Sequence, residues 1–165
     1  MDFDYSIRVD DEISTLRRIL RDNKVIAVVG LSAQWHRPSH FAAKYMMEHG
    51  YRVIPVNPQY GEVLGQKCYA SLREVAEKVD LVDVFRKTAD VMPVAEDAIA
   101  IGARVLWQQL GVTNEEAAAK ARAAGLETVM DRCVKIEHGR LFGGLNWVGV
   151  TTRVISAKRP RWLPY

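Results

Sequence analysis

One polar loop holds the residues best suited to bind a charged ligand. It lies in the stretch VVGLSAQWHRPSH, where an apolar strand ends at Gly30 and a helix is predicted to begin at Pro38. Backbone N–H groups, a hydroxyl, an amide and a guanidinium in front of a helix N-terminus favour binding of an anion, above all a phosphate. The candidate contacts in this loop are Gly30, Ser32, Ala33, Gln34, Trp35 and Arg37.

The loop lacks the pattern of a dinucleotide-binding turn. A G-x-G-x-x-G motif would place glycines where Ser32 and Trp35 stand. The next strand ends in Val56-Asn57-Pro58, without the carboxylate that holds a ribose. A Gly-Lys-Ser/Thr phosphate loop is absent from the sequence. NAD and nucleoside triphosphates therefore lose most of their support as ligands.

Five short apolar runs rich in β-branched residues predict strands buried on both faces. Helical segments alternate with them, which predicts an α/β fold: a doubly wound, Rossmann-like, parallel five-stranded sheet with helices on both faces. The strands are expected at 24–30, 51–56, 80–85, 103–108 and 126–130.

The predicted helices cover 11–22, 38–49, 71–79, a segment from Thr88 or Asp90 to Ile101, and an Ala-rich segment ending at Gly125. Capping boxes are expected at Ser71 with Glu74 and at Thr113 with Glu116. After about His138 the pattern fades, and the remainder is interpreted as an extended hairpin or a wrapping tail.

Ligands of doubly wound sheets lie beyond the carboxyl ends of the strands, where the strand order reverses. We predict the order 3-2-1-4-5, which places this crevice between the first and fourth strands. The loop after the fourth strand adds Gln108, Gln109 and Leu110, and the third strand ends in Phe85-Arg86-Lys87, which adds positive charge.

Four segments in order, GLSAQWHRPSHFAAKYMMEHGYRVIPVNP, DLVDVFR, VLWQQLGV and DRCVKIEH, resemble the single-domain CoA-binding family. That family is similar to the N-terminal CoA-binding domain of the succinyl-CoA synthetase alpha chain. The resemblance covers roughly residues 10 to 138. It implies a Rossmann-like fold that binds coenzyme A at the strand ends.

The resemblance also implies roles for single residues. The loop from Ser32 to Trp35 would meet the pantetheine and the phosphates, and the stretch from Gln108 to Leu110 would meet the thiol-bearing arm. The synthetases have Asn-Pro-Lys where this chain has Asn57-Pro58-Gln59, so one positive charge is missing, for which Arg37 or Arg86 could substitute. The synthetases carry their phosphorylated histidine in a second domain, for which this chain leaves no room. The resemblance therefore implies CoA binding rather than ligase activity.

Cys133, just after the fifth strand, has two interpretations. It is either an inert core residue or a thiol that faces the CoA thiol, with Arg132 favouring the thiolate and a mixed disulfide as the product. Cys68 is expected to be packing. Trp35 is interpreted either as core packing or as an adenine or pantetheine contact.

The remaining titratable residues indicate no catalytic group. His36 and His40 lie four residues apart, but no third metal ligand converges on them, so no metal is expected. Asp83 lies within an apolar strand and needs a partner, for which Arg86 or a backbone N–H is expected. His49 and His138 are expected at the surface.

Composition favours a single globular domain over residues 1–165, with a core at about 10–138 and a C-terminal extension at 139–165. The 165 residues are 48% hydrophobic and 26% charged, as is typical of such domains. From Leu141 onward there are four basic residues and no acids, whereas the rest carries 19 basic and 20 acidic residues, which argues against a nucleic-acid partner. With no membrane-length apolar run and no signal peptide, we expect a cytoplasmic protein without a membrane partner, with a homodimer as the default oligomer.

These observations predict a domain that binds coenzyme A or an acyl-CoA as a non-catalytic carrier, sensor or regulatory protein. One alternative is a CoA-dependent transferase or thiol–disulfide redox switch that uses Cys133. Another is a nucleotide-binding protein with a degenerate loop.

Overall fold

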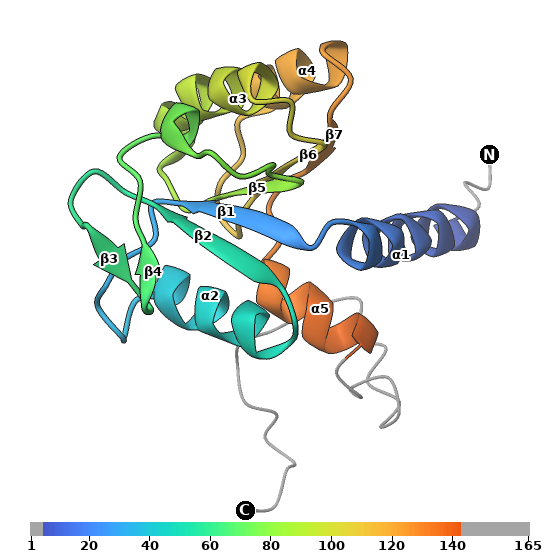
Figure 1. The fold of residues 1–165 in the computed structure, drawn as a ribbon. Helices are drawn as coiled ribbons and strands as arrows, with labels where there is room; N and C mark the ends of the chain where they lie inside the picture. The colour runs from blue at the N-terminus through green and yellow to red at the C-terminus, as the bar shows by residue number, and fades with distance from the viewer. Residues whose placement is uncertain (1–4, 143–165) are drawn as a thin grey trace, which may run out of the picture.

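The computed structural model describes residues 5–142, with side chains from residue 12 onward. A parallel five-stranded sheet lies between two layers of helices (Figure 1), as the sequence predicts. The strands are β1 (Val25–Val29), β2 (Arg52–Val56), β5 (Leu81–Val84), β6 (Val105–Gln108) and β7 (Glu127–Val129). The side chains of four of these strands are mostly buried, because helices cover both faces of the sheet, whereas only Val129 is buried in the edge strand β7.

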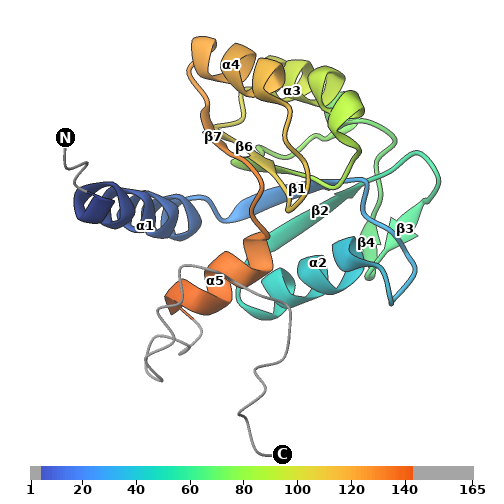
Figure 2. The same ribbon diagram turned by 180° about the vertical axis from the view of Figure 1, so that it is seen from behind.

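The helices divide between the two faces of the sheet. One layer covers the face that carries Trp107, and the other covers the face that carries Leu106. Figure 2 shows the two layers from behind. The first layer contains α1 (Tyr5–Asp22), α2 (Pro38–Glu48) and α5 (Val134–Phe142), and the second contains α3 (Val91–Ala100) and α4 (Glu115–Ala123).

The strand order is β2-β1-β5-β6-β7, so the predicted order 3-2-1-4-5 is wrong. The hairpin of β3 (Glu62–Val63) and β4 (Gln66–Lys67) leads to Tyr69, which occupies the outer edge of β2. The Tyr69 N–H donates to the Pro55 carbonyl at 3.0 Å, and the Asn57 N–H donates to the Tyr69 carbonyl at 2.8 Å. The next strand, β5, therefore pairs with the other side of β1. The strand order thus reverses between β1 and β5.

Several helix boundaries differ from the prediction. In place of a helix over 71–79 there is one 3₁₀ turn, η1 (Leu72–Glu74), and Ser71 makes no side-chain capping bond. A second turn, η2 (Thr88–Asp90), precedes α3. The N-cap of α4 is Asn114 rather than Thr113, because the Asn114 side chain accepts the Ala117 N–H at 2.9 Å. The helix α5 was not predicted. The helix α1 begins at Tyr5, earlier than its predicted start at residue 11.

Within residues 5–142, no helix is long and apolar enough to cross a membrane. Most of the predicted C-terminal extension, from residue 143, lies outside the described residues.

Candidate functional site

Gly30 is the point where three strand ends meet. Its φ of +88° lies in the left-handed region, which favours glycine. A Cβ atom there would lie 2.4 Å from the Phe85 carbonyl oxygen at the end of β5. Its N–H donates to the Val56 carbonyl at the end of β2, at 2.8 Å. Glycine thus lets β1 and β5 approach closely where the strand order reverses.

The loop that follows Gly30 is fixed at its base by buried polar groups. The Asn57 Nδ2 donates to the Leu31 carbonyl at 3.0 Å. The Ser32 N–H donates to the Ser39 Oγ at 3.0 Å. Asn57 also accepts the Gln59 N–H through Oδ1, so it joins the two loops that follow β1 and β2. Asn57, predicted as a ligand contact, is therefore buried and shapes the crevice from within the protein, whereas Gln59, also predicted as a contact, is exposed.

The tip of this loop is exposed. Trp35 is 79% exposed, which rules out core packing for its ring. The Gln34 N–H donates to the Ser32 Oγ at 3.1 Å, and the Arg37 Nε donates to the Gln34 Oε1 at 3.2 Å. The loop thus presents an aromatic ring and a guanidinium to solvent at the start of α2.

A cleft of about 290 Å³ lies beside Gly30, on the α3 side of the sheet. Pro58 and Arg86 are the two predicted site residues that line it. The other residues that line the cleft were not predicted. Those at the start of the helix after β5 could have been, because ligands of such sheets bind beyond the carboxyl ends of the strands. These walls are Val29, Val56, Ala70, Ser71, Leu72, Asp90, Pro93, Val94 and Asp97.

Arg86 brings positive charge to this cleft. Its side chain passes next to Gly30, with Cδ 3.4 Å from the position a Cβ would take. Over the described side chains, residues 12–142, no carboxylate lies within ion-pair distance of Arg86. Asp97 shares the cleft but is bound by Arg73 at 2.5 Å. The Arg86 guanidinium is therefore available to an anion.

Gln108, the last residue of β6, and Gln109, the next residue, are buried and form hydrogen bonds within the protein. The Gln108 amide bonds both the N–H and the carbonyl of Asn114, at 2.7 and 3.0 Å. The Gln109 Nε2 donates to the Asp83 Oδ1. Leu110, the next residue, is 65% exposed. Leu110 is thus the part of this predicted stretch that is most open to a ligand.

The partner of Asp83 was predicted to be Arg86 or a backbone N–H. In the structure Asp83 is instead paired with Gln109. It alternates along β5 with Val82 and Val84, which belong to the core beneath α3 and α4, so it faces the opposite layer. Complete burial raises the pKa of Asp83 to about 7, and the Gln109 hydrogen bond offsets this only in part.

Cys133 lies half-buried just before α5. Arg132, the expected source of positive charge, instead binds Glu12 of α1 and Glu137 of α5. Burial raises the pKa of the Cys133 thiol, and the Asp83 carboxylate raises it further. The predicted stabilisation of a thiolate by Arg132 is therefore wrong. Cys68 is buried, as expected for packing.

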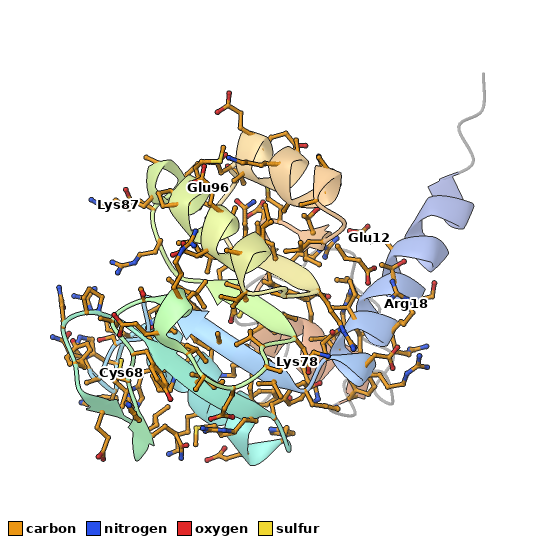
Figure 3. The ribbon with its side chains drawn as sticks, turned by 45° about the horizontal axis from the view of Figure 1, so that its top comes forward. Glu12, Arg18, Cys68, Lys78, Lys87 and Glu96 are labelled. Atoms are coloured by element: carbon orange, nitrogen blue, oxygen red, sulfur yellow. The ribbon has the colours of Figure 1, made fainter. Side chains whose placement is uncertain are left out.

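Two further features lie away from the crevice. A cleft of about 360 Å³, larger than the one at Gly30, lies between α1 and β7. At its rim Glu12 of α1, labelled in Figure 3, is bound by Arg132 of the loop that follows β7. This larger cleft sits at the sheet edge rather than at the strand-order reversal, so we favour the smaller cleft as the ligand site. In the part of the chain that the structure describes, no three metal-ligating side chains gather.

Comparisons with known proteins show what this chain is similar to. The family model for the CoA binding domain matches residues 24–139. The uncharacterized protein YneT of Bacillus subtilis is 42% identical over 123 residues, which are 74% of this chain and 91% of YneT. A hypothetical protein from Pyrococcus horikoshii has a solved structure with 46% identity and a TM-score of 0.78, covering 79% of this chain and 92% of its own. The ADP-forming acetate–CoA ligase I of Archaeoglobus fulgidus is 40% identical over 58 residues, 35% of this chain and only 8% of the ligase.

Proposed function

The chain belongs to the CoA binding domain family, and from this premise we propose that it binds coenzyme A or an acyl-CoA at the strand-order reversal, as a non-catalytic carrier, sensor or regulatory protein. The observation that carries the proposal is the meeting of Gly30, Phe85 and Arg86 at one point. There the backbone is bare, and an arginine that has no carboxylate partner among residues 12–142 lies beside a cleft. A diphosphate needs both features.

We propose a division of labour among the contacts. Arg86 takes a phosphate at the cleft, and Arg37 supplies a second positive charge from the loop after β1. Trp35 covers the ligand from the solvent side, and Leu110 lies along the pantetheine arm. Succinyl-CoA synthetases have a lysine at the position of Gln59. In this proposal the two arginines supply the positive charge that this lysine would provide.

Isothermal titration with CoA tests the proposal, with dephospho-CoA and NAD as controls. We expect CoA to bind and NAD to bind far more weakly, because β2 ends without the carboxylate that holds the adenosine ribose of NAD. Weaker binding of dephospho-CoA would place the 3′-phosphate in contact with the protein. A folded sample that binds NAD or ATP but not CoA would overturn the proposal.

Arg86→Gln should weaken CoA binding by roughly 10- to 100-fold, the loss typical of one charged hydrogen bond. Lys87→Gln is the matched control, because Lys87 is the next residue and points away from the body of the protein (Figure 3). Both variants remove one charge, so they separate a direct contact from the general attraction of the anion. Equal losses in the two variants would contradict a phosphate contact at Arg86.

The alternative of a transferase or redox switch stays a prediction, and the neutral state of Cys133 does not favour it. If the protein is a binding domain, Cys133→Ser should leave the dissociation constant for CoA within about twofold, since serine is close in size to cysteine. Mass spectrometry without reductant should find no CoA adduct on the wild-type chain. An adduct on Cys133, absent from the variant, would instead favour the redox alternative. The cytoplasmic location likewise stays a prediction.

A further inference from the structure

His138 lies in an aromatic cluster that joins α5 to α2. It is 6% exposed, although the sequence analysis expected it at the surface. Its Nδ1 lies 3.0 Å from the Tyr45 hydroxyl of α2. The Phe142 ring stacks on it at 5.1 Å between centroids, and the Tyr51 ring meets it edge-on at 5.5 Å. The imidazole is thus enclosed by rings and by one hydroxyl.

The charged and titratable groups around this ring disfavour a second proton. His49, at the end of α2, lies 5.2 Å from His138 between centroids. Lys24, before β1, lies over the Tyr51 ring at 4.2 Å. On α5 itself, Lys135 lies over the Tyr45 ring at 5.7 Å. The neighbouring Glu137 carboxylate is bound by Arg132 and Arg140. Among the side chains that the structure describes, an imidazolium at His138 would therefore face cations and rings without a carboxylate of its own.

The hydrogen bond to Tyr45 adds a directional cost. A neutral imidazole can accept the Tyr45 hydroxyl hydrogen at Nδ1, whereas an imidazolium must donate from that atom. The Tyr45 hydroxyl would then have to turn and find another acceptor.

We propose that His138 makes the docking of α5 on α2 a pH-sensitive latch, closed when the imidazole is neutral and released when it is protonated. Release moves the ring into water, where a positive charge is tolerated. The strands stay paired when α5 is released, because the cluster connects two helices and the residue before β2, and does not include the interior of the sheet.

The direction of the effect follows from linkage. Burial, with His49 and Lys24, lowers the pKa of His138 below its ordinary value of 6.5. The released state therefore binds protons more readily than the docked state. Docking is strongest above about pH 6.5 and weakens on acidification, by up to about tenfold per pH unit, until the pKa of the docked state is reached.

Hydrogen exchange and NMR on the full chain test the latch. Between pH 7.5 and 5.5, after correction for intrinsic exchange rates, protection of the α5 amides should fall by about tenfold while β1 and β5 keep theirs. The His138 ring resonances should give a pKa below 6.5. Unchanged α5 protection, a parallel loss in the sheet, or a His138 pKa of 6.5 or higher would each overturn the proposal.

Two variants separate the latch from general acid sensitivity. His138→Phe keeps a ring but cannot take a proton, so its α5 protection should no longer depend on pH. His49→Gln removes a neighbouring titratable group and should keep the transition while moving its midpoint to higher pH. A His138→Phe chain that still loses α5 protection at pH 5.5 would show that another group is responsible. If His138→Phe fails to fold, the hydrogen exchange of α5 and the His138 pKa in the wild-type chain decide whether the latch exists.

Discussion

Replacing Gly30 with alanine is expected to lower the free energy of unfolding by about 3–5 kcal/mol. A positive φ costs an alanine roughly 1–2 kcal/mol by itself. The remainder comes from the Phe85 carbonyl, which would lie 2.4 Å from the new methyl group and cannot withdraw without pulling β5 from β1. CoA binding should fail with it, because the same displacement moves Arg86.

Gly50→Ala is the matched control for this prediction. Gly50 has nearly the same φ, +86°, but nothing lies within 4 Å of the Cβ it would gain. The Gly50→Ala variant should therefore lose only roughly 1–2 kcal/mol of unfolding free energy, which is the cost of the backbone conformation. Urea unfolding followed by circular dichroism measures both variants. Similar losses at the two positions would mean that the β1–β5 approach can relax.

Asp83→Asn is expected to stabilise the protein in alkaline solution. The pKa of Asp83 is raised from 3.8 to about 7, so the folded chain binds a proton that the unfolded chain releases. This contribution is fully present below about pH 4 and is lost as the pH rises through 7. A buried carboxylate at pH 8.5 thus costs roughly 4 kcal/mol, which an amide of the same shape avoids.

The measurement is the urea unfolding free energy at pH 5 and at pH 8.5. The wild-type chain should lose roughly 3 kcal/mol from this group over that range, and Asp83→Asn should lose correspondingly less. Asp90→Asn, at an exposed carboxylate, should follow the wild-type pH profile. If Asp83→Asn and the wild type keep parallel profiles, the Asp83 carboxyl does not titrate in this range.

The strands were predictable because each is an apolar run covered on both faces, a property that lies within the run itself. Their order was not, because it depends on a contact between distant segments. Tyr69 covers the outer edge of β2 and leaves β1 as the partner of β5. Nothing in the residues from β2 to β5 marks this choice.

The candidate site shows the same division. The loop after Gly30 was found because strand, glycine and helix follow one another in the sequence. The cleft walls on η1 were missed because they reach the site only through the tertiary fold, whereas those at the start of α3 follow the end of β5 in the sequence. For Asp83 and Cys133, the predicted charge partner was a sequence neighbour, Arg86 or Arg132. The structure instead gives Asp83 a partner from the loop just after β6 and turns Arg132 towards α1 and α5.

The covered edge of β2 also bears on how the protein behaves at high concentration. An open edge strand is a template on which a second chain can add its own strand, the first step of many aggregates. Here Pro55 offers no N–H within the edge strand, and Tyr69 already occupies the Pro55 carbonyl and the Asn57 N–H. The segment that decides the strand order thus also denies other molecules a place to pair.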